Sequence, residues 1–132
     1  MESERDEAVS EEAIRELCRR LRLFFASHNM DLFEKVCFDD TLCTAFALST
    51  DDCCFLIDRV RQSILRDYHN LVQVVKKLSE KEPQARIFGI LLVGTTQGIA
   101  SEFLRFAGMN GIALLEPDKA REFIEEKLAK TT

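Results

Sequence analysis

The sequence predicts an all-α fold, a single compact bundle of about six helices around an apolar central helix. The 15 residues from 87 to 101 carry no charge, which is typical of an element enclosed by others. Through most of the remaining chain, apolar residues recur three or four positions apart, as in amphipathic helices. The chain has 132 residues, of which 46% are hydrophobic, so one core and one domain are expected.

The first predicted helix begins at Ser10 and ends near Asn29. Serine is a preferred N-cap, and Val9 and Ile14 have the spacing of a hydrophobic staple around it. The predicted inner face comprises Ile14, Leu17, Cys18, Leu21, Phe24 and Phe25. The predicted solvent face carries Arg15, Arg19 and Arg22. This pattern predicts an amphipathic helix packed on one side.

Three more helices are predicted before residue 82. Two short ones cover residues 32–37, closed by Asp39 and Asp40, and residues 42–48. A helix of about 25 residues follows the cluster at 49–52, because apolar residues recur at helical spacing. These residues are Ile57, Val60, Ile64, Tyr68, Leu71, Val75 and Leu78. Its basic residues, Arg59, Arg61, Arg66, Lys76 and Lys77, are expected on a solvated surface.

The central helix is predicted over residues 86–107 and the last helix from Pro117 onward. Small and polar residues form one seam along the central helix, where a neighbouring backbone could approach closely. This seam is the predicted partner-binding site and comprises Gly94, Gly98, Ser101 and Arg105.

An α+β fold is the alternative interpretation, with a short strand at 87–93, a turn at 94–98 and a second strand at 112–115. Gly89, Gly94 and Gly98 favour it, because each glycine costs a solvent-facing helix about 1 kcal/mol relative to alanine. Residues 10–82 show no strand-like alternation, and two strands alone make a poor sheet. The bundle is therefore the preferred prediction.

The net charge of −5 lies entirely in the N-terminal region. Residues 1–12 hold six acids and one arginine, whereas the rest of the chain balances 17 acids against 17 bases. We expect a mobile acidic tail over 1–9 followed by one helical domain over 10–132. Without a global basic field, nucleic acid is not an expected partner.

The five cysteines show neither an even framework nor a C-x-x-C pair, which predicts reduced thiols in a cytoplasmic or nuclear protein. The N-terminus is acidic, unlike a secretory signal. The uncharged segment would extend roughly 22 Å as a helix, too short for a membrane span. His28 and His69 have no zinc-like spacing to the cysteines, so neither a metal nor a cofactor is expected.

No catalytic group is predicted. Gly89 and Gly94 are spaced like a phosphate-binding loop, but the lysine of that motif is absent. Cys53 and Cys54 adjoin carboxylates, which would raise a thiol pKa and so oppose activation. The chain is therefore expected not to be an enzyme.

The sequence leaves two functional hypotheses. The first is a non-enzymatic adaptor that presents a groove or helix face to a protein partner, at Gly94, Gly98, Ser101 and Arg105. The alternative is a small α/β protein that binds an anionic ligand at the turn from Gly94 to Gly98. Neither the partner nor the oligomeric state is predicted.

Overall fold

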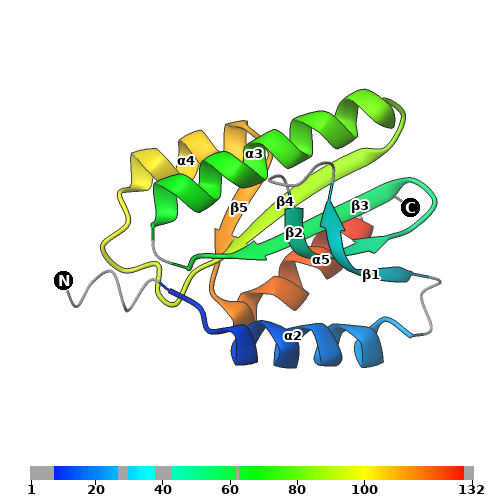
Figure 1. Ribbon diagram of the computed structural model, residues 1–132, viewed down its shortest axis with the longest axis horizontal. Helices are drawn as coiled ribbons and strands as arrows, with labels where there is room; N and C mark the ends of the chain where they lie inside the picture. Colours follow the sequence, from blue (N-terminus) through cyan, green and yellow to red (C-terminus); the bar gives the residue numbers. More distant parts are fainter. Residues whose placement is uncertain (1–7, 27–29, 38–42, 62, 130–132) are drawn as a thin grey trace.

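The computed structural model shows an α+β fold in which helices cover both faces of a five-stranded mixed sheet (Figure 1). It describes residues 8–26, 30–37, 43–61 and 63–129. In chain order the elements are α2 (Glu11–Phe24), β1 (Asp31–Cys37), β2 (Cys43–Ser49), β3 (Cys53–Arg59), α3 (Ile64–Lys81), β4 (Arg86–Leu92), α4 (Ser101–Met109), β5 (Ile112–Leu115), the 3-10 turn η1 (Pro117–Lys119) and α5 (Ala120–Ala129).

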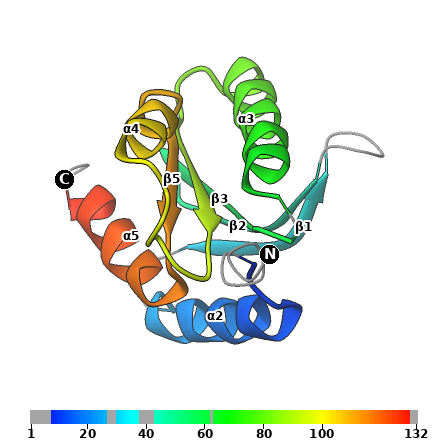
Figure 2. The same ribbon diagram turned by 90° about the vertical axis from the view of Figure 1, so that its left-hand side faces the viewer.

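The strands lie in the order β1-β2-β3-β4-β5. The first three form antiparallel pairs, whereas β3, β4 and β5 are parallel, with α3 and α4 as the connections. Figure 2 shows α3 and α4 on one face of the sheet and α2 and α5 on the other. The sheet therefore separates two apolar clusters, one beneath each helix pair.

The all-α prediction is wrong, because residues 43–59 form strands β2 and β3 instead of helices. Side chains along β3 alternate between the two clusters: Phe55 and Ile57 face α2 and α5, whereas Leu56 faces α3. A strand buried on both faces is apolar at every position and lacks the alternation of a half-exposed strand. The predicted short helix at 32–37 is also wrong, because this segment forms strand β1.

The uncharged segment contains strand β4 and the loop that follows it, as in the α+β interpretation, and not a central helix. Gly89 is needed for close packing within this strand. A Cβ atom at this position would collide with the Ile112 side chain on β5 and would lie 3.1 Å from Val75 on α3. Glycine thus lets β4 approach both neighbours.

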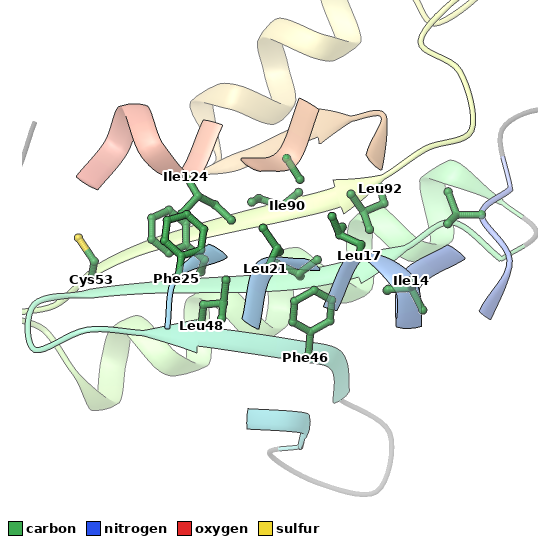
Figure 3. Close-up of a cluster of buried hydrophobic side chains, with 14 residues drawn as sticks. Ile14, Leu17, Leu21, Phe25, Phe46, Leu48, Cys53, Ile90, Leu92 and Ile124 are labelled. Carbon is green, nitrogen blue, oxygen red and sulfur yellow. The ribbon is translucent and has the colours of Figure 1, made fainter. Parts of the chain in front are cut away.

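The first helix agrees with the prediction at its start. The Ser10 hydroxyl accepts a hydrogen bond of 3.1 Å from the Ala13 N–H, so Ser10 is the N-cap of α2. Figure 3 shows Ile14, Leu17 and Leu21 pointing into the cluster beneath α2. The helix ends at Phe24, earlier than the predicted Asn29, which lies outside the described residues.

The predicted long helix is only the segment Ile64–Lys81, capped by Ser63. The end of the predicted tail is fixed in the structure: Val9 is buried, and its N–H donates to the Val60 carbonyl at 2.8 Å. Residues 1–7 lie outside the described part, as do Asp39 and Asp40.

The prediction of five reduced cysteines is also wrong, because Cys37 and Cys43 form a disulfide. These residues face each other in the β1–β2 pairing, with Cα atoms 4.0 Å apart. Two separate helices would not have brought them together, so the helical interpretation hid the pair. Cys18, Cys53 and Cys54 are free thiols.

Among the residues described, no helix combines the length and the apolar character needed to cross a membrane.

Candidate anion-binding cleft

A cleft of about 680 Å³ lies between helix α2, the β1–β2 hairpin and the end of β3. Six basic side chains line it, namely Arg15, Arg19, Arg22, Lys35, Arg59 and Arg61. The acidic lining residues are Glu11 and Glu34. This excess of positive charge stands out in a chain whose net charge is −5.

Helix α2 supplies one wall of the cleft. Arg15, Arg19 and Arg22 follow each other at intervals of four and three residues, which places them along one side of the helix. Each pairs with a glutamate: Arg15 with Glu11 at 2.9 Å, Arg19 with Glu16 and Arg22 with Glu34. These pairs are exposed, and such pairs contribute only about 0–1 kcal/mol, so a bound anion can replace them.

The edge strand β1 supplies Glu34 and Lys35. Lys35 has a φ of 55°, in the left-handed region that is unusual for a residue other than glycine. Neighbouring side chains on a strand normally point to opposite faces. Here Glu34 and Lys35 both line the cleft, while Val36 packs against the cluster beneath α3. The local conformation therefore brings a lysine to the cleft at an energetic cost of about 1–2 kcal/mol.

Arg59 and Arg61 approach from the end of β3. Nη1 of Arg59 donates a hydrogen bond of 2.7 Å to the Val9 carbonyl, which orients the guanidinium without neutralising it. Nη2 of Arg61 lies 3.6 Å from Oδ1 of Asp58. Within the described residues, neither Lys35 nor Arg59 forms an ion pair with a carboxylate.

Two buried carboxylates hold the segment that carries these arginines. Oδ1 of Asp58 accepts the Arg59 N–H at 2.9 Å, and Oδ2 of Asp67 accepts the Arg61 N–H at the same distance. Burial raises the pKa of Asp58 to about 6, opposed by the Arg59 N–H and by the Arg61 guanidinium. Asp58 and Asp67 thus position the loop after β3.

Thr44 lies in the cleft wall on β2 and is only 2% exposed. Its hydroxyl oxygen is the one buried side-chain polar atom without a hydrogen-bond partner in the described part of the chain. An unsatisfied buried hydroxyl costs about 1–3 kcal/mol. Such a group calls for an explanation, and a ligand that accepts a hydrogen bond is one.

The predicted site residues do not lie in this cleft. Gly94 and Gly98 belong to the loop between β4 and α4, while Ser101 and Arg105 are exposed residues of α4. They form no helix seam. Gly94 lines a second hollow, of about 330 Å³, whose acidic lining residues are Glu16, Glu116 and Asp118.

Two backbone N–H groups of the loop at 94–98 already donate to side-chain acceptors of the chain. Oε2 of Glu116 accepts the Thr96 N–H at 3.0 Å, and the Thr95 hydroxyl accepts the Gln97 N–H at 3.2 Å. A carboxylate therefore occupies the position that the alternative hypothesis assigned to an anionic ligand.

Among the described residues, neither the free thiols nor a cluster of metal-ligating side chains forms a second candidate site. Burial raises the pKa of Cys54 to about 11 and that of Cys53 above its usual value, so both stay protonated near neutral pH. In the described ranges, no three His, Cys, Asp or Glu side chains gather as a metal site would require.

Sequence reasoning missed the cleft because it assigned its walls to the wrong elements. Arg15, Arg19 and Arg22 were expected on an open solvated face, and Arg59 and Arg61 on a helix. One signal was available in the sequence: three arginines lie on the same side of a helix whose start is marked by the N-cap Ser10. What faces them depends on the β1–β2 hairpin, which the helical interpretation did not contain.

Comparison with known proteins gave no match to a family model, to a curated protein or to a solved structure.

Proposed function

We propose that this chain is a non-enzymatic binding module that holds an acidic segment of a protein partner in the cleft beside α2. The observation that carries the proposal is the cleft lining of six basic and two acidic side chains. Guanidinium and ammonium groups bind and orient carboxylates and phosphates through charge-assisted hydrogen bonds. The proposal moves the partner-binding surface from the 94–105 region to the cleft beside α2, on the opposite face of the sheet from α4.

The arginine row on α2 suits an extended chain. From Arg15 to Arg22 the helix rises by about 10 Å, and adjacent arginines stand roughly 5–6 Å apart. Alternate side chains of an extended segment repeat every ~6.6 Å, close to that spacing. Two or three acidic side chains of a partner could therefore replace Glu11, Glu16 and Glu34 in the exposed ion pairs.

Two features favour a protein segment over a nucleic acid. Glu11 and Glu34 line the cleft, and a nucleic acid, which carries a charge at every phosphate, could not avoid them, whereas a peptide can place neutral residues opposite them. Phe46 is the aromatic side chain in the lining, and it is only 2% exposed, so it offers no face on which a base could stack.

The predicted cytoplasmic location remains a prediction. The Cys37–Cys43 disulfide weighs against it, because reducing compartments keep most thiols reduced.

The test is a fluorescence-anisotropy titration of the full chain with an extended hexapeptide of alternating acidic residues, beside its Gln/Asn counterpart. We expect binding of the acidic peptide only, weakened about tenfold, or about 1.4 kcal/mol, by the double variant Arg19→Glu/Arg22→Glu. Arg105→Glu is the matched control, because Arg105 is exposed on α4 on the other face of the sheet. Circular dichroism checks that both variants fold.

Three results would contradict the proposal. They are equal binding of the acidic and amide peptides, loss of binding in Arg105→Glu instead of the α2 variant, and tighter binding of a single-stranded oligonucleotide than of the acidic peptide.

A further inference from the structure

The end of the cleft beside strands β1, β2 and β3 differs from the arginine row on α2. Lys35, Thr44 and Arg59 come from three successive strands of the sheet. Thr44 pairs with Val36, the neighbour of Lys35, and the antiparallel register that joins Phe46 to Ile57 places Thr44 and Arg59 at the same end of their strands. We call these three residues the floor of the cleft: Thr44 is buried, Arg59 is half-buried and Lys35 is exposed at the edge of the sheet.

Within the described residues, neither Lys35 nor Arg59 has a carboxylate within ion-pair distance, and Arg61 at the rim has only the 3.6 Å contact with Asp58. The positive charge of Arg59 also acts on Asp58 at longer range and helps to lower the pKa of that carboxyl. By contrast, the three arginines of α2 each have a glutamate partner. A ligand group with a charge near −2 would balance Lys35 and Arg59.

The Thr44 hydroxyl adds a neutral donor to these two cations. It is buried and lacks a partner in the described residues, so it can donate to a ligand oxygen without giving up an existing hydrogen bond. A phosphate monoester carries a charge of about −1.5 to −2 near neutral pH and has three strong acceptor oxygens. Donors that arrive from three strands suit a tetrahedral group better than a planar carboxylate.

We propose that the cleft floor is a subsite for a phosphate monoester, carried by a phosphorylated side chain of the partner's acidic segment. The proposal rests on the proposed function, which supplies the acidic segment held by α2. Lys35 and Arg59 balance the charge of the phosphate, and Thr44 donates to one of its oxygens.

The ligand must displace some covering atoms to reach Thr44, because the hydroxyl oxygen is itself buried. Arginine side chains line the cleft together with Thr44, and Arg61 is half-exposed. Binding of the phosphate to the hydroxyl therefore requires a rotation of Thr44 about χ1 and a shift of neighbouring side chains.

The first experiment maps binding on the ¹⁵N-labelled full chain by NMR, with phenyl phosphate as the probe and benzoate as a planar control. We expect phenyl phosphate to shift the amide signals of Lys35, Thr44 and Arg59, and benzoate to shift them far less. Equal effects of both probes, or shifts elsewhere only, would overturn the subsite. This measurement needs no variant, so it decides the question even if a substitution at Thr44 prevents folding.

The second experiment substitutes the hydroxyl. Thr44→Val keeps the shape but removes the donor, and we expect phenyl phosphate affinity to fall about tenfold. Thr44→Ser should stay within about twofold of the native chain. Thr96→Val is the matched control, because the Thr96 hydroxyl already donates to Glu116 outside this cleft. Unchanged affinity in Thr44→Val would contradict the assigned role.

The third experiment identifies the source of the phosphate. An acidic peptide with one phosphoserine should bind at least tenfold more tightly than both its unphosphorylated form and phenyl phosphate. If the acidic peptide binds through Arg19 and Arg22 but phosphorylation adds nothing, the subsite is wrong and the proposed function stands. If phenyl phosphate binds through Thr44 while neither peptide binds, the ligand is a free phosphorylated molecule, and the partner-borne phosphate and the proposed function both fail.

Discussion

The buried carboxylate of Asp58 lies 3.6 Å from the half-exposed guanidinium of Arg61, at the edge of the basic cleft. Burial disfavours the ionised form of the Asp58 carboxyl, whereas the Arg61 guanidinium is always charged. Burial is the main cause of the raised pKa of Asp58, so Arg61 only partly offsets the cost of removing the carboxylate from water.

The first prediction concerns the pH dependence of stability. The pKa of Asp58 rises from 3.8 to about 6 on folding, so the folded chain binds the proton more tightly than the unfolded chain. This contribution is fully present below about pH 4 and is lost as pH rises through 6. We expect the free energy of unfolding of the native chain to fall by about 2–3 kcal/mol over that window relative to Asp58→Asn.

Urea denaturation of both chains at several pH values between 4 and 7 measures this difference. Asp51→Asn, in the exposed turn between β2 and β3, is the control and should follow the native chain. Parallel stability curves for the native chain and Asp58→Asn would show that Asp58 does not titrate in this range.

The second prediction concerns the close packing at Gly89. Gly89→Ala places a methyl group against Ile112 and Val75, and overpacking of this kind costs about 1–3 kcal/mol. Gly108→Ala is the matched control, since a Cβ atom there meets open space on α4 and alanine is the better helix former by about 1 kcal/mol. Thermal unfolding should show opposite shifts in Tm, and a rise in Tm for Gly89→Ala would contradict the β4–β5 packing.

The third prediction counts thiols. Denatured without reductant, the chain should expose three reactive thiols to a thiol reagent, and five after reduction. The double variant Cys37→Ser/Cys43→Ser should lose about 2 kcal/mol of stability, because the disulfide restricts the unfolded hairpin. Cys18→Ser, which leaves the disulfide intact, is the control. Five reactive thiols before reduction would restore the original prediction of reduced cysteines.

The fourth prediction concerns the sheet core. Leu92 on β4 is fully buried between the helices, so Leu92→Asp should prevent folding, since an unpaired buried carboxylate costs several kcal/mol. Leu65→Asp is the control because Leu65 is 68% exposed on α3. Soluble Leu92→Asp protein with native Tm would show that β4 is not in the core.

The sequence alone was sufficient to predict the helices that expose one face to solvent. Ser10 marked the start of α2, and Pro117 marked the region of η1 and α5. Strand β3 has no visible period of two in the sequence, because Phe55, Leu56 and Ile57 are all fully buried and all apolar. Ile57, Val60 and Ile64 have helical spacing in the sequence, but Ile57 lies in β3, Val60 in the loop and Ile64 at the start of α3.

The candidate cleft was less predictable than the fold. Arg15, Arg19 and Arg22 were predicted on one face of the first helix, but Lys35 and Thr44 belong to the hairpin that was predicted as two short helices. Neither the left-handed backbone at Lys35 nor the unsatisfied hydroxyl of Thr44 has a signature in one sequence, because both arise from the tertiary pairing of β1 with β2.

The left-handed backbone at Lys35 has a consequence for self-association. Strand β1 is at the edge of the sheet, where an unpaired row of backbone groups invites a strand from another molecule. A residue with φ of 55° in the middle of β1 interrupts the regular ladder that such a strand would need, and its lysine adds charge there. These features disfavour the addition of a sixth strand at the β1 edge, so a partner that binds there is expected to be recognised through side chains.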